Sequence, residues 1–229
     1  MTADPSPANP NSGHRARLRQ RLFEGGDSAL LDHELVEYLL ALAIPRRDTK
    51  AQAKALIARF GGIGPLLGAD ADALRREGLS DGVIGALKIA EASARRLLET
   101  RIEGRPLLSS WDALGDYLQA TMGHSAVEEV RILFLNAKNL LIANEALWRG
   151  SVDEAAVHVR EVIARAIQLG ATALIIVHNH PSGDPSPSQQ DIRLTRDLIE
   201  AGRHIKVTVH DHVIVGSQGR TSMKAMGLI

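Results

Sequence analysis

The chain of 229 residues is 45% hydrophobic and 24% charged, which is typical of a folded protein with one large domain or two small ones. Its 27 basic and 27 acidic residues balance, so no overall positive charge indicates nucleic acid or an anionic membrane as a partner. The absence of cysteine excludes a disulfide scaffold, a cysteine nucleophile, a thiolate zinc site and an iron–sulfur cluster.

The first half of the chain has a helical pattern. A tail at 1–13, rich in proline and small polar residues, is expected to be disordered, and a helical domain is expected at 14–105. Glycine and proline at 103–106 indicate a linker to the second half. Four helices joined by glycine-rich turns are expected at 32–42, 48–60, 69–76 and 83–99.

The second half, at 106–229, has the pattern of an α/β domain. We expect a mixed sheet with flanking helices, in which the apolar run at 173–177 is a strand buried on both faces. The sequence has no apolar run of membrane-spanning length and no secretory leader pattern, so we expect a soluble, cytoplasmic protein with no membrane partner. The other strands are expected at 130–135, 140–145, 207–209 and 213–215, and the helices at 110–121, 151–169 and 188–201.

Two histidines and an aspartate follow the buried strand. Residues two apart in a strand project to one face, so the imidazoles of His178 and His180 are expected to point to the same place. The Gly/Pro/Ser-rich segment at 181–187 must reverse the chain, and Asp191 returns in the first turn of the next helix. Two neutral histidines and one carboxylate are the protein ligands of an open catalytic zinc site, in which water takes the fourth position. The pattern therefore predicts a metal site.

Each part of this pattern also has a structural interpretation. Ser188 and Asp191 form a capping box, which is compatible with metal binding because one carboxylate oxygen can bind an ion while Ser188 caps the helix. A second His-x-His pair, His210 and His212, lacks a carboxylate at the matching distance, where Met223 stands instead. We interpret that pair as structural or as a support for the ligands, and it is also the candidate source of a fourth ligand.

The spacing of the metal-site residues resembles the zinc site of the JAMM (MPN+) metalloproteases. The string His-Asn-His-Pro-Ser-Gly-Asp at 178–184, with Asp-His-Val-Ile-Val-Gly at 211–216 and the helical first half, resembles the bacterial RadC family more closely, over about residues 14–229. The residues that match the JAMM motif are His178, His180, Ser188 and Asp191.

The resemblance implies a JAMM/MPN-like fold for the second half and Zn²⁺ as its cofactor. His178, His180 and Asp191 would then be the metal ligands. Ser188 would be a catalytic residue that polarises the scissile carbonyl or orients the attacking water.

The resemblance also implies an upstream glutamate that carries protons from water to the leaving amine, because an amine leaves poorly until it is protonated. Glu128 and Glu129 are adjacent, and only one of them can face the site from a strand. We choose Glu128, whose distance before Phe-Leu-Asn at 134–136 best fits the family pattern, and expect Glu129 to be solvent-exposed. Glu145 and Glu154 are the less favoured alternatives.

For the helical half, the resemblance implies a helix-hairpin-helix module that binds DNA. Its turn would be Gly78-Leu79-Ser80, in which serine replaces the second glycine and hinders close approach of the backbone to phosphate. Acidic side chains lie among the basic ones, so the alternative is a solvated helix surface. The candidate DNA contacts are Arg75, Arg76 and Lys88.

Two classes of function remain. The first is a zinc-dependent hydrolase, a metallopeptidase or isopeptidase, acting on a peptide or protein substrate that the sequence does not identify. The second is a DNA-associated accessory protein of repair or recombination, in which the metal site is structural or secondary. We favour the hydrolase because a structural zinc site is usually fully ligated, and the sequence offers three evident ligands. A nuclease is less favoured because phosphodiester cleavage usually recruits two carboxylate-rich metal sites.

Overall fold

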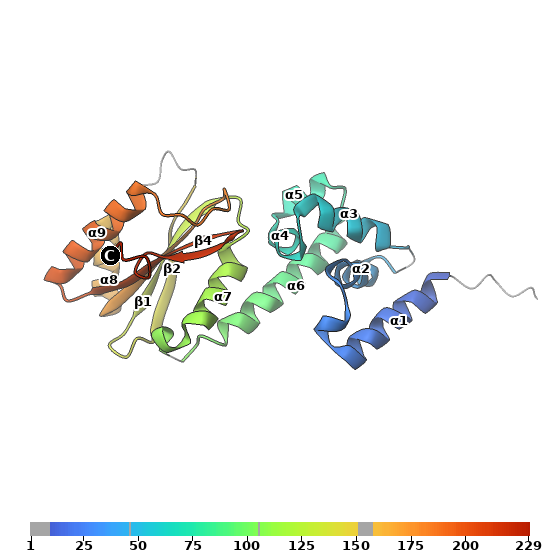
Figure 1. Ribbon diagram of the computed structural model, residues 1–229, viewed down its shortest axis with the longest axis horizontal. Coiled ribbons are helices and arrows are strands. Elements are labelled where there is room, and N and C mark those ends of the chain that lie inside the picture. Colours follow the sequence, from blue (N-terminus) through green and yellow to red (C-terminus); the bar gives the residue numbers. More distant parts are fainter. Residues whose placement is uncertain (1–9, 46, 105, 151–157) are drawn as a thin grey trace, which may run out of the picture. The chain divides into compact units, whose positions relative to one another are not determined.

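A computed structural model of the chain describes residues 10–45, 47–104, 106–150 and 158–229 (Figure 1). The chain divides into two compact units, Met1–Glu91 and Ala92–Ile229. The division falls within helix α6 (Asp81–Glu99), upstream of the glycine and proline at 103–106. In the described ranges, the structure has no helix whose length and hydropathy would suit a membrane crossing.

The N-terminal unit is helical, as the sequence predicts. Its core consists of aliphatic side chains at helical spacing, among them Val36, Leu40 and Leu87, each at most 1% exposed. The elements are α1 (Pro10–Gly25), a 3-10 helix at Asp27–Ala29, α2 (Asp32–Ala43), α3 (Lys50–Phe60), α4 (Ile63–Gly68), α5 (Ala71–Arg76) and the first part of α6.

Two features of this unit differ from the sequence prediction. Residues 10–13 belong to α1, although the sequence placed them in a disordered tail, and residues 1–9 lie outside the described part of the chain. Neither α1 nor α4 is among the four predicted helices. Helix α4 lacks a helical sequence signal because its six residues include three that are glycine or proline.

The C-terminal unit is an α/β domain with one mixed sheet of five strands in the order β2-β1-β3-β4-β5. Strands β3 and β4 are parallel, and the other neighbouring pairs are antiparallel. The elements are a 3-10 helix at Leu107–Ser110, α7 (Trp111–Met122), β1 (Glu128–Leu135), β2 (Leu141–Gly150), α8 (Val159–Leu169), β3 (Ala173–Asn179), α9 (Gln189–His204), β4 (Thr208–Gly216) and β5 (Gly219–Ser222).

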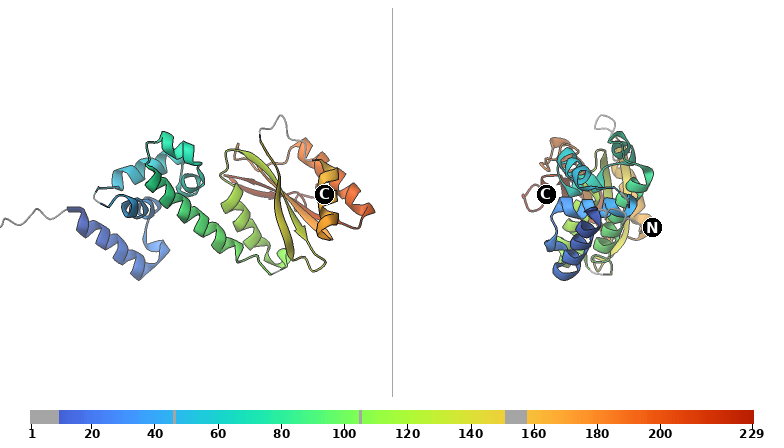
Figure 2. Two further views of the ribbon diagram at one scale, coloured as in Figure 1. Left: turned by 180° about the vertical axis from the view of Figure 1, so that it is seen from behind. Right: turned by 90° about the vertical axis from the view of Figure 1, so that its right-hand side faces the viewer.

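The sheet has a hydrophobic core on each face. Strand side chains alternate between these cores: Ile175 packs in the core that contains Leu118 of α7, whereas Ile176 packs in the core that contains Val162 of α8 and Leu198 of α9. Helix α7 therefore covers one face, and α8 and α9 cover the other (Figures 1 and 2). Burial on both faces explains why β3 is a continuous apolar run.

Strand β4 is one strand, whereas the sequence predicted two pieces at 207–209 and 213–215. The register against β3 shifts by one residue, since Leu174 pairs with Val209 and Ile175 pairs with Asp211. His210 is the extra residue of this β-bulge, which interrupts the apolar alternation that the prediction followed. Strand β5 was also not predicted, and residues 151–157 of the expected helix at 151–169 lie outside the described part of the chain.

Helix α9 makes the crossover between the parallel strands β3 and β4, so the loop at 180–188 leaves the carboxyl end of β3 and leads into the helix. The carboxyl ends of parallel strands are where α/β sheets place their ligands. A functional site is therefore expected at the carboxyl ends of β3 and β4.

Candidate metal centre

His178 and His180 meet at the carboxyl end of β3. His178 has the same strand parity as Ile176, so its side chain lies on the face covered by α9, and the residue is 2% exposed. The backbone N–H of His180 donates to the carbonyl of Val215 (2.9 Å), which extends the strand geometry beyond Asn179. As a result, the Nε2 atoms of the two imidazoles lie 2.8 Å apart.

Asp191 reaches the same place from the first turn of α9. Its Oδ1 lies 3.4 Å from Nε2 of His178, and its Oδ2 lies 3.8 Å from Nε2 of His180. The capping box is also present: Ser188 N–H donates to Oδ2 (2.7 Å), and Asp191 N–H donates to Ser188 Oγ (3.2 Å). The cap uses Oδ2 and leaves Oδ1 facing His178, so the structure accommodates both interpretations of Asp191.

The three side chains fit a divalent metal ion. Their candidate ligand atoms all lie within 4.8 Å of one another. Zinc bonds of about 2.0–2.2 Å in a tetrahedron place neighbouring ligand atoms roughly 3.3–3.6 Å apart. The separations of 3.4 and 3.8 Å between Asp191 and the two imidazoles are close to this range, whereas the 2.8 Å between the two Nε2 atoms is shorter and would widen around a bound ion. The donor set of two imidazole nitrogens and a carboxylate oxygen, without thiolate, suits zinc and other borderline divalent ions.

The Nδ1 atoms of His178 and His180, which are not the proposed ligand atoms, both have hydrogen-bond partners. Nδ1–H of His180 donates to the carbonyl of Asp184 (2.8 Å), so its Nε2 is the unprotonated nitrogen when the ring is neutral. Nδ1 of His178 lies 2.7 Å from Nε2 of His212, whose Nδ1 lies 2.6 Å from Oγ1 of Thr195. Burial, opposed by the carboxylate of Asp191, lowers the pKa of His178 to about 4, so this ring is neutral near pH 7, as a metal ligand must be.

Glu128 shares a cavity with these residues. It begins β1 with the strand parity of Val130, which faces α9, and it lines a cavity of about 360 Å³ together with His178, His180, Ser188 and Asp191. Burial raises the pKa of the Glu128 carboxyl; the neighbouring His180 lowers it and Asp191 raises it further. A half-buried carboxylate that binds protons more readily than usual suits a group that takes and returns a proton.

Glu129 has the opposite strand parity and lies away from this cavity. Its carboxylate pairs with Arg131 and lies 3.9 Å from Nε of Arg149, and its side chain is 16% exposed. The expectation that Glu129 is solvent-exposed was therefore wrong, because its carboxylate is held against the sheet by the neighbouring Arg131.

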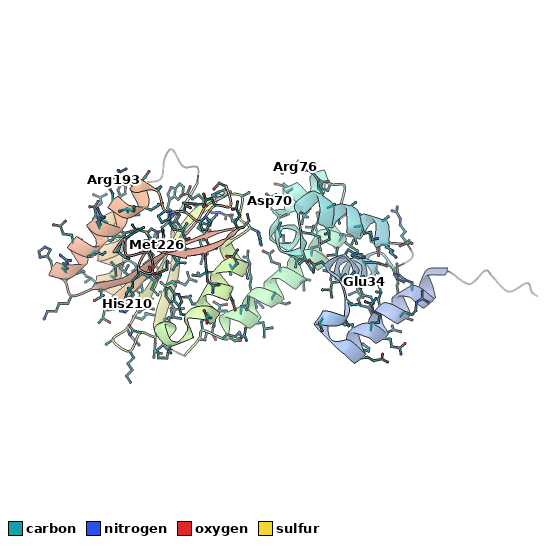
Figure 3. All side chains as sticks on the ribbon, in the orientation of Figure 1. Glu34, Asp70, Arg76, Arg193, His210 and Met226 are labelled. Carbon is teal, nitrogen blue, oxygen red and sulfur yellow. The ribbon has the colours of Figure 1, made fainter. Side chains whose placement is uncertain are left out.

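The remaining candidates for the site lie elsewhere. Glu145 on β2 is bound by the guanidinium of Arg165 on α8, and Glu154 lies outside the described residues. His210 lies on β4 and is labelled in Figure 3. Its Nε2 is paired with the side-chain oxygen of Asn139 (2.7 Å). His212 directs its two ring nitrogens to His178 and Thr195. Neither of these histidines is arranged as a fourth ligand.

The candidate DNA contacts of the N-terminal unit have acidic neighbours. Arg75 pairs with Asp72 (2.8 Å) and Asp81 (3.2 Å), and Lys88 pairs with Glu91 (2.8 Å). Arg76 is exposed at the end of α5 (Figure 3). The charges of Arg75 and Lys88 are thus partly compensated within the unit, which weakens their attraction for phosphate.

The loop that carries His180 is held by a close backbone contact that the sequence did not predict. A Cβ atom on Gly216, at the end of β4, would lie 2.2 Å from the carbonyl oxygen of Gly183. The same oxygen accepts from the backbone N–H of Gln218 (3.1 Å), and Gly183 N–H donates to the carbonyl of His180 (2.9 Å). Glycine at 216 therefore lets the loop at 180–188 pack directly against the β4–β5 turn.

We expect Gly216→Ala to lower the free energy of unfolding by about 1–3 kcal/mol, the usual cost of forcing atoms into a packed site. The displaced loop should also bind metal less tightly, because it carries His180. Urea unfolding and metal titration test this, with Gly85→Ala as the control, since a Cβ on Gly85 meets nothing within 4 Å. Equal stability of wild type and Gly216→Ala would contradict the packing argument.

Comparisons with known proteins agree with this fold. A family model described as a RadC-like JAB domain matches residues 108–228. A UPF0758 protein of Ruegeria pomeroyi is 46% identical over 217 residues, which cover 94% of this chain and 97% of that protein. A UPF0758 protein of Rhodobacter capsulatus is 46% identical over 213 residues, covering 93% of this chain and all of that protein. Neither name states an activity.

Proposed function

Because this chain belongs to the RadC family and carries a JAB-like domain, we propose that it is a zinc-dependent hydrolase of peptide or isopeptide bonds. The observation that supports this most directly is the convergence of His178, His180 and Asp191 on a cavity that Glu128 also lines. Three protein ligands and an accessible cavity are the arrangement of a catalytic site rather than of a closed structural one.

The three ligands would hold Zn²⁺ through Nε2 of both histidines and through Asp191. When bound in such a site, zinc would lower the pKa of water to about 7, which would supply a nucleophile near neutral pH. The histidines and the aspartate contribute by holding their lone pairs toward one point. Hydrogen bonds with the main chain of Asp184 and Ser188 restrain His180 and Asp191, and the side chain of His212 restrains His178.

Glu128 is the group that we propose moves the proton. Its carboxylate takes a proton from the water molecule as the water oxygen bonds to the carbonyl carbon of the substrate. It then gives that proton to the nitrogen as the carbon–nitrogen bond breaks, so the amine leaves in neutral form. The raised pKa of Glu128 favours the first transfer, and its position in the cavity allows both.

Ser188 is the group that we propose binds the scissile carbonyl. Its Oγ accepts the capping hydrogen bond from the N–H of Asp191, and this leaves the hydroxyl proton available to donate. Ser188 lines the same cavity as Glu128. A hydrogen bond to the carbonyl oxygen would strengthen as negative charge develops there.

We expect the zinc-loaded protein to cleave members of a library of internally quenched peptides, including isopeptide-linked ones. Chelation of the metal should abolish cleavage, and added Zn²⁺ should restore it, because the water needs the ion as an activator. The His178→Ala protein, measured in parallel, identifies cleavage by contaminating proteases. Cleavage that persists after chelation, or none across the library, would count against the proposal.

A DNA-associated accessory role is the second proposal, and the observation in its favour is the exposed guanidinium of Arg76 beside the turn at Gly78. We favour the DNA-associated role less than the hydrolase, because Arg75 and Lys88 are paired with acidic side chains. Salt-dependent DNA binding that survives His178→Ala would support this role.

A further inference from the structure

We propose that Thr195 and His212 are positioning residues that fix the tautomer of His178, so that its Nε2 presents a lone pair to the metal. The inference rests on the metal site of the proposed function and adds two residues to it. Neither residue is itself a candidate metal ligand, so both would act through His178.

The three side chains form a buried chain of hydrogen bonds. Oγ1 of Thr195 on α9 lies 2.6 Å from Nδ1 of His212 on β4, and Nε2 of His212 lies 2.7 Å from Nδ1 of His178 on β3. Thr195 and His212 are 0% exposed and His178 is 2% exposed. A histidine binds a metal ion as the neutral imidazole, so we consider this chain with one proton on each ring.

Protons can be arranged along this chain in two ways. In the first, the Thr195 hydroxyl donates to His212, His212 donates from Nε2 to His178, and the proton of His178 is on Nε2, facing His180 and Asp191. In the second, every bond is reversed: His178 donates from Nδ1 to His212, and His212 donates from Nδ1 to Thr195. Both arrangements hold the same number of protons, and only the second leaves Nε2 of His178 free to bind a metal.

Thr195 makes the second arrangement possible because it has another acceptor for its own proton. Its Oγ1 donates to the main-chain carbonyl of Asp191 at 2.6 Å, one helical turn earlier. The hydroxyl can therefore accept from His212 while its proton remains hydrogen-bonded. The same residue, Asp191, thus contributes its carboxylate to the candidate metal site and its carbonyl to the chain that prepares His178.

The fold places His212 in this chain through the β-bulge at His210. Val207 and Val209 pack on the face covered by α9, whereas Val213 and Val215 pack on the face covered by α7. The extra residue reverses the strand parity between these pairs, so His212 lies on the α9 face with His178. Without the bulge, the side chain of His212 would lie on the opposite face, away from Thr195.

The variant Thr195→Val tests whether the hydroxyl of Thr195 is needed to position His212 and His178. It keeps the shape of the side chain and removes the acceptor for His212. We expect a roughly 10–100-fold loss of zinc affinity, the usual effect of removing a hydrogen-bond partner behind a metal ligand. Thr195→Ser should restore most of the affinity, because it restores the hydroxyl. The measurement is competition with a chelator of known affinity, beside thermal unfolding of the metal-free proteins.

A matched control is Thr121→Val. Thr121 is also a helical threonine whose hydroxyl donates to the carbonyl four residues earlier, that of Tyr117, at 2.8 Å, and it contacts no histidine through that hydroxyl. We expect it to leave zinc affinity unchanged. Equal affinities of wild type and Thr195→Val would overturn the inference, whereas failure of wild type to bind zinc would overturn the proposed function.

The tautomers can also be observed directly, without a variant. Long-range ¹H–¹⁵N correlation spectra of the zinc-loaded wild type should show His178 and His212 protonated on Nδ1. A proton on Nε2 of His212 in that state would contradict the proposed chain, even if zinc is bound. The spectra therefore separate a failure of this inference from a failure of the metal site itself.

Discussion

Replacing Glu128 by glutamine is expected to remove most of the hydrolytic activity while leaving zinc in place. Glutamine has the shape of glutamate and cannot accept the proton of water, and general acid–base catalysis of this kind contributes about 10²–10⁴-fold to rate. The effect should appear in kcat rather than in KM, because Glu128 transfers the proton during the reaction and is not proposed to bind the substrate. Steady-state kinetics and metal analysis of the same preparation measure the two results together.

The control for this variant is Glu129→Gln. Glu129 is adjacent in sequence, lies on the opposite face of β1 and pairs with Arg131, so its replacement should leave kcat close to that of wild type. Loss of zinc from Glu128→Gln would show that Glu128 is a ligand and would require another proton carrier. Full activity of Glu128→Gln would remove it from the mechanism altogether.

Replacing His180 by alanine is expected to release the metal and, with it, all zinc-dependent activity. The loss of zinc affinity should exceed the ~10–100-fold expected for a residue that only supports a ligand. The fold should persist, because the strand-like bond at this position comes from the backbone N–H of His180, which alanine retains. Inductively coupled plasma mass spectrometry and far-UV circular dichroism of the purified variant test both statements.

His210→Ala is the matched control, because His210 belongs to the other His-x-His pair and is bound to Asn139 instead of to the candidate ligands. It should retain zinc at the level of wild type. Retention of zinc by His180→Ala, or its loss from His210→Ala, would mean that the metal lies at a different site.

The sequence could predict the elements around the site because each has a local signal. The apolar run of β3 indicates a strand buried on both faces, and Ser188 with Asp191 indicates the start of α9. Strand parity then brings the two histidines to one side. Strand β4 was predicted less well, because the bulge at His210 depends on pairing with β3, which the sequence of β4 does not contain.

The candidate site also has a part with a local sequence signal and a part that depends on packing between distant segments. The spacing of His178, His180 and Asp191 is local, and the structure brings these three side chains together. Thr195 lies within a helix, and no sequence pattern links it to His212 on the following strand. Their contact arises from the packing of α9 on β4, so it could be recognised only once that packing was known.

The zinc content and coordination of the purified wild-type protein test the central claim most directly. We expect metal analysis to find one zinc ion per chain, and X-ray absorption spectroscopy to find two imidazole ligands with oxygen ligands that include water. A folded chain that binds no zinc, or a zinc ion surrounded by four protein side chains, would contradict the account.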